Sequence, residues 1–411
     1  MKKLIIILFA LLLISQNSST QTWIRKLDGY SLWSIACDFQ GNIYAGTTGS
    51  NRGIFKSTDG GDNWTNVYST GTSNYLNIAC DSLNNVYVAN VSNGIMISTN
   101  GGQNFTNVPV SSFGGNSVNA VACGKNGYIY VGCTNGGVHR STDYGATFTN
   151  TGVLGLTTVE IFVDRFNPNF VYAGVSSASD GGFYRSTDAG LTFSANLNPS
   201  AKIWEVIQNS TGNLFTVVTS TGYPFDKSTN GGLNWTTLYN FSGARRGACF
   251  DLIENIYTAG NGGVFKSTNG GTTFVNFNFT NSSNKIVNFQ NRILVAATGT
   301  STGGVWIYVD TTISNISYNQ GNIPKDYYLN QNYPNPFNPI TNINYSITKR
   351  THVKLIVYDI DGRTIETLVD EIQSPGNYDI KWNALNFSSG IYFYKLITDE
   401  FEDSKSMVLL K

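Results

Sequence analysis

Two glutamates have the residue type and placement that acid and base catalysis needs. Glu160 and Glu205 occupy corresponding positions in two successive repeats of the sequence. Glycoside hydrolysis uses such a pair of carboxyl groups, one as general acid and the other as base or nucleophile. The pair therefore supports one enzymatic hypothesis, a glycoside hydrolase that uses Glu160 and Glu205. We predict no other catalytic residue.

The sequence offers few candidate residues for other kinds of catalysis. The chain has two histidines, so a Ser/His/Asp triad in the repeat region would depend on His139 alone. His139 falls in a repeated strand, where other copies carry Phe55 or Tyr184, and this favours a structural role. A zinc site needs clustered His, Cys or carboxylate ligands, and the sequence shows no such cluster. We therefore predict no metal and no cofactor.

Ligand-binding side chains are better represented. Aromatic rings stack on sugar faces or peptide side chains, and charged groups orient a polar ligand. Aromatic and charged residues both occur in the loops that lead into the first strand of each repeat. The alternative is that these residues are ordinary loop residues with no binding role. These candidate binding residues are Trp33, Tyr75, Asn119, Trp204, Arg245, Arg246 and Lys285.

Two sequence patterns alternate along residues 35–310 and must position these side chains. The first is a strand, such as Asn42-Ile43-Tyr44-Ala45-Gly46, in seven copies. The second follows a short strand and reads Ser-Thr-Asp/Asn-x-Gly-x-x-aromatic, in six copies. Its serines, at positions 57, 98, 141, 186, 228 and 267, are 39–45 residues apart. This is the length of one four-stranded propeller blade, so we predict an all-β fold with a seven-bladed β-propeller over residues 21–310.

The second pattern has a physical explanation as a tight turn. The Asp or Asn side chain accepts hydrogen bonds from turn amides, Gly takes the positive φ, and the aromatic ring packs under the hairpin. We therefore predict structural roles for Ser57, Asp59, Trp64, Ser98, Asn100, Phe105, Ser141, Asp143, Phe148, Ser186, Asp188, Phe193, Ser228, Asn230, Trp235, Ser267, Asn269 and Phe274.

The seventh repeat lacks this turn and the aromatic strand after it. Thr22-Trp23-Ile24 precedes the first repeat just as Asn63-Trp64-Thr65 precedes the second. We therefore expect the start of the mature chain to supply the outer strand of the seventh blade, which closes the ring and removes an exposed sheet edge.

The turn pattern resembles the Asp-box, or bacterial neuraminidase repeat, of sialidase-like, sortilin-like and photosystem-assembly-factor-like propellers. Sialidases of this family bind the substrate carboxylate with three arginines and carry an Arg-Ile-Pro element. No Arg-Ile-Pro occurs in this sequence, so the resemblance does not imply sialidase activity. Propeller xyloglucanases use acidic residues but join two propellers, whereas this chain has repeats for one.

The last 84 residues, 328–411, predict a second domain. Alternating strands such as 343–347 and 353–357 are separated by turns such as Asp361-Gly362, which fits an immunoglobulin-like β-sandwich. The segment also resembles the type A sorting domain of type IX secretion cargo. The residues that carry this resemblance as a sorting signal are Tyr333, Pro334, Pro336, Phe337, Pro339, Gly390, Tyr392, Lys405 and Lys411. It implies the type IX secretion machinery as a partner.

Composition agrees with an exported protein. Residues 1–20 read as a signal peptide, residues 311–327 as a linker, and we predict no transmembrane span in the mature protein. Cys37, Cys80 and Cys123 recur at one repeat position, which indicates small buried residues rather than a disulfide framework. Lys plus Arg and Asp plus Glu are both 26, so there is no basic surface for nucleic acid.

These observations lead to one main prediction and two alternatives. The main prediction is a non-enzymatic propeller, secreted or on the outer surface of a Gram-negative bacterium, that binds a polysaccharide or a surface protein at its channel mouth. The first alternative is the hydrolase that uses Glu160 and Glu205. The second is a structural component of the envelope in which the propeller is a spacer.

Overall fold

The computed structural model describes residues 22–411 except 39, 50–51, 70–73, 125, 154, 177–180, 195–196, 198–201, 221, 300, 311–325, 349–350 and 374–375. The predicted signal peptide and most of the predicted linker lie outside the described residues. The described part of the chain is all-β, with one turn of 3-10 helix, η1 (Val110–Phe113), and no α-helix. It contains no helix with the length and apolar character needed to cross a membrane.

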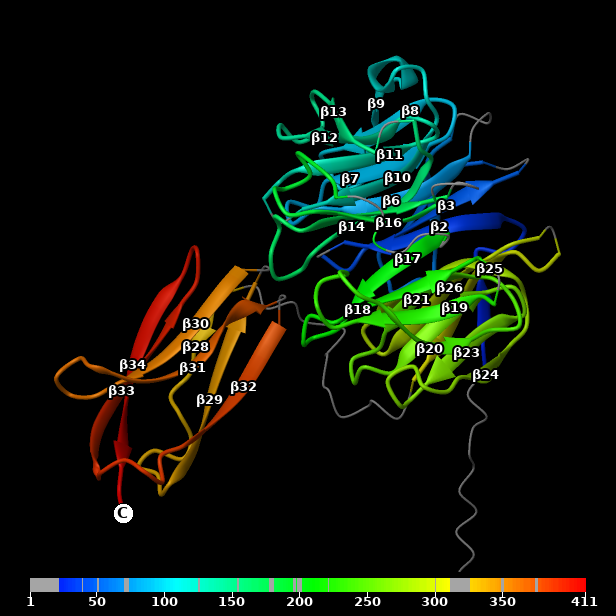
Figure 1. The fold of residues 1–411 in the computed structure, drawn as a ribbon. Helices are drawn as coiled ribbons and strands as arrows, with labels where there is room; N and C mark the ends of the chain where they lie inside the picture. Colours follow the sequence, from blue (N-terminus) through cyan, green and yellow to red (C-terminus); the bar gives the residue numbers. More distant parts are fainter. Residues whose placement is uncertain are drawn as a thin grey trace, which may run out of the picture.

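The described strands between residues 24 and 309 form antiparallel sheets that succeed one another along the chain (Figure 1). Six of these seven sheets have four strands and one has three. The sheets are β2 (Ser31–Cys37), β3 (Ile43–Thr48), β4 (Ile54–Ser57) and β5 (Thr65–Tyr68); β6 (Tyr75–Cys80), β7 (Val86–Asn90), β8 (Gly94–Ser98) and β9 (Thr106–Val108); β10 (Val118–Cys123), β11 (Ile129–Cys133), β12 (Gly137–Ser141) and β13 (Thr149–Gly152); β14 (Thr158–Val163), β15 (Val171–Val175) and β16 (Gly182–Ser186); β17 (Ile203–Gln208), β18 (Leu214–Val218), β19 (Pro224–Ser228) and β20 (Thr236–Asn240); β21 (Arg245–Phe250), β22 (Ile256–Gly260), β23 (Gly263–Ser267) and β24 (Val275–Phe279); and β25 (Ser283–Phe289), β26 (Arg292–Ala297), β27 (Gly304–Val309) and β1 (Ile24–Lys26).

The sheets close into a ring through their first strands. Each of β2, β6, β10, β14, β17 and β21 contacts the first strand of the following sheet, and β25 contacts β2 again. This cyclic contact is the arrangement of a β-propeller, in which the first strand of every blade lines a central channel. The first strands therefore bring residues from all parts of the repeat region to one axis.

The two ends of the repeat region meet in one sheet. Strand β1 pairs antiparallel with β27, with Ile24 opposite Ile307, as the sequence predicted for the closing strand. Asp62, in a turn of the first sheet, ties this junction together through ion pairs with Lys26 at 3.2 Å and Arg292 at 2.9 Å. The sheet of β14–β16 has three described strands. The strand expected after Phe193 falls partly on residues 195–196 and 198–201, which lie outside the described residues.

The six predicted turns share one set of hydrogen bonds. In the first, Ser57 Oγ donates to Asp59 Oδ1 at 2.8 Å and accepts from the Gly61 amide at 2.9 Å. Asp59 Oδ1 also accepts from the Asn63 amide at 2.9 Å. Partial burial opposes ionisation of Asp59, yet the bonds from Asn63 and Ser57 lower its pKa to about 2. The same serine-to-glycine contact recurs from Ser98, Ser141, Ser186, Ser228 and Ser267.

A second repeated turn joins the first two strands of several sheets, at the end of the strands opposite the channel mouth. Asp81 is buried, and its carboxylate accepts from the amides of Leu83 and Asn85, from the Asn85 side chain and from the Tyr87 hydroxyl. Asp38 and Asp251 head equivalent turns. Sequence analysis used the strand that follows this turn but missed the aspartate, which recurs four residues before Asn42, Asn85 and Asn255.

The C-terminal strands form a body of their own (Figure 1). One sheet contains β28 (Tyr328–Leu329), β29 (Ile340–Ile347) and β32 (Gly376–Asn383), and the other contains β31 (Thr364–Gln373), β30 (Thr351–Tyr358), β33 (Gly390–Ile397) and β34 (Glu402–Leu409). Ile343 and Trp382 of the first sheet share one buried core with Leu355 and Tyr394 of the second. Two sheets around a common core make this domain a β-sandwich.

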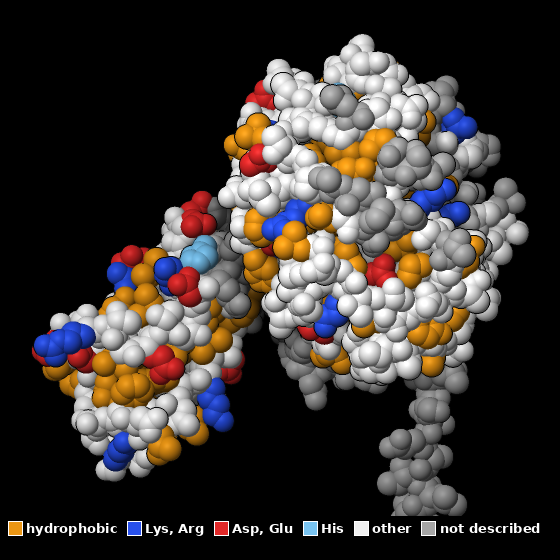
Figure 2. Space-filling model, in the orientation of Figure 1, with side chains coloured by type: hydrophobic (Ala, Val, Ile, Leu, Met, Phe, Trp, Pro, Cys, Tyr) orange, Lys and Arg blue, Asp and Glu red, His pale blue; other side chains and the backbone are white. Residues whose placement is uncertain are grey.

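Charge is sparse on the propeller surface. On the face in Figure 2, the propeller shows few acidic and basic side chains between its hydrophobic and other surface atoms, in line with the 13% of charged residues in the sequence. The turn Asp359-Ile360-Asp361-Gly362 joins β30 to β31, and Asp359 Oδ1 accepts from the amides of Asp361 and Arg363. Its carboxylate therefore serves a hairpin turn.

Candidate functional site

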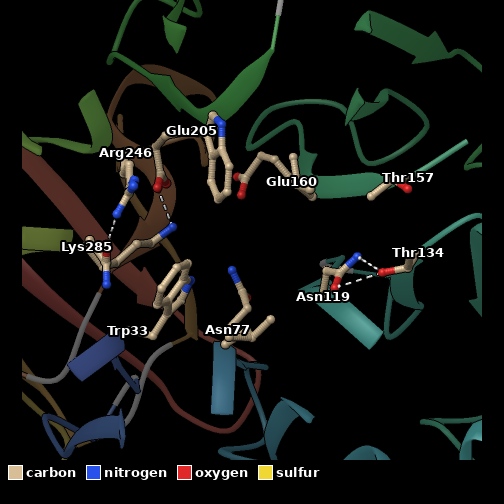
Figure 3. A pocket seen from close by; sticks show the side chains of 13 residues that line it. Trp33, Asn77, Asn119, Thr134, Thr157, Glu160, Glu205, Arg246 and Lys285 are labelled. Carbon is tan, nitrogen blue, oxygen red and sulfur yellow. Dashed lines mark hydrogen bonds and ion pairs between the residues drawn. The ribbon is translucent and has the colours of Figure 1, made fainter. Parts of the chain in front are cut away.

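All seven first strands carry an irregularity in pairing at the same place. In each, the residue just after the first one or two pairs bulges out, as at Trp33 between Leu32 and Ser34 or at Trp204 between Ile203 and Glu205. A bulge of this kind redirects side chains. The bulged residues all line one pocket of about 150 Å³ at the channel mouth (Figure 3). They are Trp33, Leu76, Asn119, Val159, Trp204, Arg246 and Asn284.

The residue after the bulge lines the pocket in some sheets but not in others. Four of these residues have long or polar side chains and also line the pocket: Asn77, Glu160, Glu205 and Lys285. The other three are Ser34, Ala120 and Gly247. A Cβ on Gly247 would lie 3.0 Å from the Cα of Lys285, so glycine permits the close approach of the strand that carries this lysine.

Lys285 and Glu205 form an ion pair although the sheet of β21 stands between their two sheets in the ring (Figure 3). The side chains are 20% and 9% exposed. Burial lowers the pKa of Lys285, but attraction to Glu205 and Glu160 outweighs burial and raises it, so the ammonium stays charged. Burial raises the pKa of Glu205, and Lys285 opposes that rise. Glu205 therefore has a fixed cationic partner.

Glu160 lies on the neighbouring sheet and is 5% exposed. Burial, followed by repulsion from Glu205, raises its pKa well above the ordinary range, while Lys285 and the amide of Val206 oppose the rise. Lys285 therefore attracts both buried carboxyl groups, Glu160 and Glu205. Since two nearby carboxylates resist joint ionisation, the protonated form of Glu160 is favoured.

Arg246 is held between the two tryptophans of the pocket. Its guanidinium carbon lies 5.7 Å from the ring centroid of Trp33 and 5.9 Å from that of Trp204. Its Nη1 donates to the side-chain oxygen of Asn284 at 2.8 Å. These contacts fix the guanidinium by cation–π attraction and one hydrogen bond.

The opposite wall of the pocket is uncharged and polar. Asn119 donates to the Thr134 hydroxyl at 2.9 Å and to the backbone oxygen of Thr158 at 3.3 Å. Thr157 donates to the Asn135 side chain at 3.1 Å. Asn77 also faces the pocket (Figure 3). The site therefore combines a charged, aromatic side with a side of amides and hydroxyls.

Two predicted binding residues lie outside this pocket. Tyr75 is buried in a core cluster and packs edge-on against Tyr68. Arg245 is 2% exposed, lies over the rings of Phe241 and Phe265, and donates to the backbone oxygen of Gly263. Both residues immediately precede a bulge. Their side chains point into the blade, and those of the next residues point into the channel.

The other predicted site residues are placed as follows. Trp33, Asn119, Glu160, Trp204, Glu205, Arg246 and Lys285 come together in the pocket. His139 is buried in β12, with Nδ1 3.7 Å from the sulfur of Cys133 and an edge-on contact with Phe113. Burial lowers its pKa. Within the described residues the five cysteines are free, and no group of three or more His, Cys, Asp or Glu side chains could hold a metal.

Sequence analysis missed several lining residues. Leu76, Asn77, Val159 and Asn284 could have been found by aligning the repeats on Glu160 and Glu205, because they stand at the same place or one before it. Thr134 directly follows β11, and Thr157 directly precedes β14.

Comparison with known proteins identifies the C-terminal domain. Its paired strands and shared core coincide with a match to a family model over 80 residues. Residues 331–410 match the secretion system C-terminal sorting domain. This sorting domain directs export by the type IX secretion system to the cell surface or the extracellular space, and it implies interaction with the type IX machinery. No curated protein matches the sequence.

Solved structures similar to this chain are propeller-type proteins. YCF48 bound to D1 peptide is 16% identical with a TM-score of 0.55, over 70% of this chain and 96% of that one. The GH74 enzyme of Niastella koreensis is 16% identical with a TM-score of 0.56, over 95% and 75%. PorZ, a surface component of the type IX system of Porphyromonas gingivalis, is 12% identical with a TM-score of 0.54, over 93% and 59%. At these identities the likeness shows the fold alone.

Proposed function

We propose that this protein is an exported, non-enzymatic binding module that holds a polysaccharide or a surface protein at the mouth of its propeller channel. The observation that carries the proposal is the convergence of one bulged residue from every first strand on a single pocket. A ligand there would contact side chains that differ from blade to blade, although the blades share one backbone plan. Specific recognition needs a small number of polar and aromatic groups that converge on a concave site.

Two features favour binding over hydrolysis. Glu205 is paired through Oε2 with Lys285, and this positive partner makes its carboxylate a weaker base. The pocket volume of about 150 Å³ is below the several hundred Å³ of a typical small-molecule site. A pocket of this size suits one sugar ring or one side chain, whereas cleavage within a chain also needs room beyond the scissile bond.

The ligand class has two candidates. The indole rings of Trp33 and Trp204 and the amides of Asn77 and Asn119 would suit a sugar. A protein ligand deserves the same test, because the structurally similar YCF48 was solved with a D1 peptide.

The second candidate function is a glycoside hydrolase that uses Glu160 and Glu205. One observation favours it: both carboxyl groups line the same pocket, and the raised pKa of Glu160 is what a general acid requires. The similarity to the GH74 enzyme makes a polysaccharide the substrate class to test.

One experiment separates these functions. The purified chain is incubated with immobilised polysaccharides and surface proteins, and both retained protein and newly formed reducing ends are measured. We expect retention without new reducing ends, and a loss of about tenfold in affinity for Trp33→Ala. Tyr144→Ala is the matched control, because Tyr144 is aromatic and 49% exposed but lies on a turn after β12, away from the pocket.

The other results contradict the proposal in different ways. New reducing ends that disappear in Glu160→Gln or Glu205→Gln would establish a hydrolase. Neither retention nor cleavage would favour the structural spacer. Retention that Trp33→Ala leaves unchanged would place the binding surface elsewhere on the protein.

A further inference from the structure

We propose that the ligand of the channel-mouth pocket is an acidic saccharide, and that Arg246 binds its carboxylate. This inference rests on the proposed function and names the chemical class that the pocket selects. It follows from the charges of the pocket, from the way in which Arg246 is held, and from the chemistry of the opposite wall.

The charges that line the pocket do not cancel locally. Four titratable side chains are present: Glu160, Glu205, Arg246 and Lys285. Lys285 and Glu205 neutralise each other through their ion pair. Burial raises the pKa of Glu160, and none of the ion pairs found between described residues includes this carboxyl group. Arg246 is then the remaining charge, and none of the ion pairs found between described residues includes it.

The surroundings of Arg246 leave most of its hydrogen-bonding capacity unused. A guanidinium has five N–H donors in a planar fork, and Asn284 receives one of them, from Nη1, at 2.8 Å. The contacts to Trp33 and Trp204 involve ring faces, which accept no conventional hydrogen bond. A partner with two oxygens in one plane, such as a carboxylate, fits this fork in a bidentate manner. The cation is therefore fixed in place before a ligand arrives.

The rest of the pocket suits a sugar. Asn77, Asn119, Thr134 and Thr157 offer amide and hydroxyl groups across from Arg246 (Figure 3), and such groups pair with sugar hydroxyls in either direction of donation. The indole rings give flat apolar walls for the C–H face of a ring. With about 150 Å³ available, the pocket takes one sugar unit. We therefore infer a uronic acid residue as the bound unit.

Binding of defined oligosaccharides to the purified full chain tests this inference. Isothermal titration calorimetry is performed with trimers of galacturonic acid and of glucuronic acid, and with the methyl ester of each. A short peptide with a free C-terminus and its C-terminal amide form a separate arm. We expect at least one uronate trimer to bind about tenfold or more tightly than its ester, because a bidentate charge-assisted contact is lost in the ester.

Variants assign the preference to Arg246. Arg246→Gln should bind acid and ester equally, and Arg246→Lys should recover part of the preference, because it keeps the charge but not the fork. Arg363→Gln is the matched control, since Arg363 is 75% exposed on the sorting domain. Circular dichroism establishes that each variant is folded.

The contrary results are distinct from a failure of the proposed function. Equal binding of acid and ester, or a preference that survives in Arg246→Gln and Arg246→Lys, would overturn the carboxylate contact but leave a binding module. Binding of the free peptide acid without either uronate would overturn the saccharide class. No binding of any probe here, together with retention on the larger panel, would overturn this inference alone.

Discussion

Replacing Lys285 by methionine should destabilise the propeller by an amount that depends on pH. The ammonium of Lys285 is the fixed partner of Glu205 and also attracts Glu160. Removing one partner of a buried pair leaves an uncompensated charge and costs about 3–5 kcal/mol. At roughly 2–4 °C per kcal/mol, the melting temperature of the propeller should fall by about 6–20 °C at pH 8. Thermal unfolding followed by circular dichroism measures this change.

The pH dependence has a definite sign. Burial raises the pKa of both carboxyl groups in the folded protein, and without Lys285 that rise becomes larger. A carboxyl group whose folded pKa exceeds its unfolded value of about 4.3 penalises folding most at high pH, and the penalty shrinks as pH falls toward 4.3. The loss caused by Lys285→Met should therefore be smaller at pH 5 than at pH 8. Adding Glu205→Gln should restore part of the stability at pH 8.

A second lysine provides the control for this prediction. Lys266 lies 5.0 Å from the ring centroid of Tyr257, and no ion pair of the described residues includes it. Lys266→Met should cost about 1 kcal/mol or less, the value of an exposed cation–π contact, with little dependence on pH. An equal effect of the two substitutions, or a loss at Lys285 that is the same at pH 5 and pH 8, would refute the reasoning.

Three further predictions concern the scaffold. Gly263→Ala should lower the free energy of unfolding, measured by urea denaturation, by about 3 kcal/mol or more, because the new Cβ would lie 1.6 Å from a backbone oxygen of β24. Gly115→Ala is the control, since Gly115 has φ +81° and no atom within 4 Å of the added Cβ. It should lower the free energy of unfolding by only about 1–2 kcal/mol. Asp81→Ala removes a buried acceptor of four hydrogen bonds and should lower the free energy of unfolding by about 3 kcal/mol. Tyr87→Phe removes one of these bonds and should lower it by about 1 kcal/mol. Equal losses would contradict the role of Asp81 as the centre of the turn. Deleting β1 leaves the outer edge of β27 unpaired, while β26 still pairs with its other edge. The deletion should lower the melting temperature and increase light scattering on heating, and an unchanged melting curve would show that the closing strand is dispensable.

Much of the fold could be predicted from local sequence. The turn serines and aspartates act on amides two to four residues away, so their spacing reveals them without any knowledge of the tertiary structure. In the C-terminal domain, alternation of buried and less buried residues marks strands such as β30, whereas inner propeller strands such as β7 are buried at every position. Closure by β1 could also be predicted, because the aromatic strand missing from one end of the repeat region is present at the other.

The membership of the pocket could be predicted only in part. Register along the repeats placed Glu160, Glu205 and Trp33 at the channel mouth. It could not separate Arg245 from Arg246, because the two are adjacent and a bulge decides which of them leaves the plane of the blade. The equivalent bulge in β6 follows the buried Tyr75 and turns the next residue, Leu76, toward the channel.

The chemistry of the pocket was decided by tertiary structure. Glu205 and Lys285 are 80 residues apart in the chain, and they meet because β21, which carries Gly247, packs against both β17 and β25. The repeat pattern indicates only the residues that fold each blade. Which charges meet across the channel depends on how the blades are ordered around it, and this order places Lys285 beside Glu205.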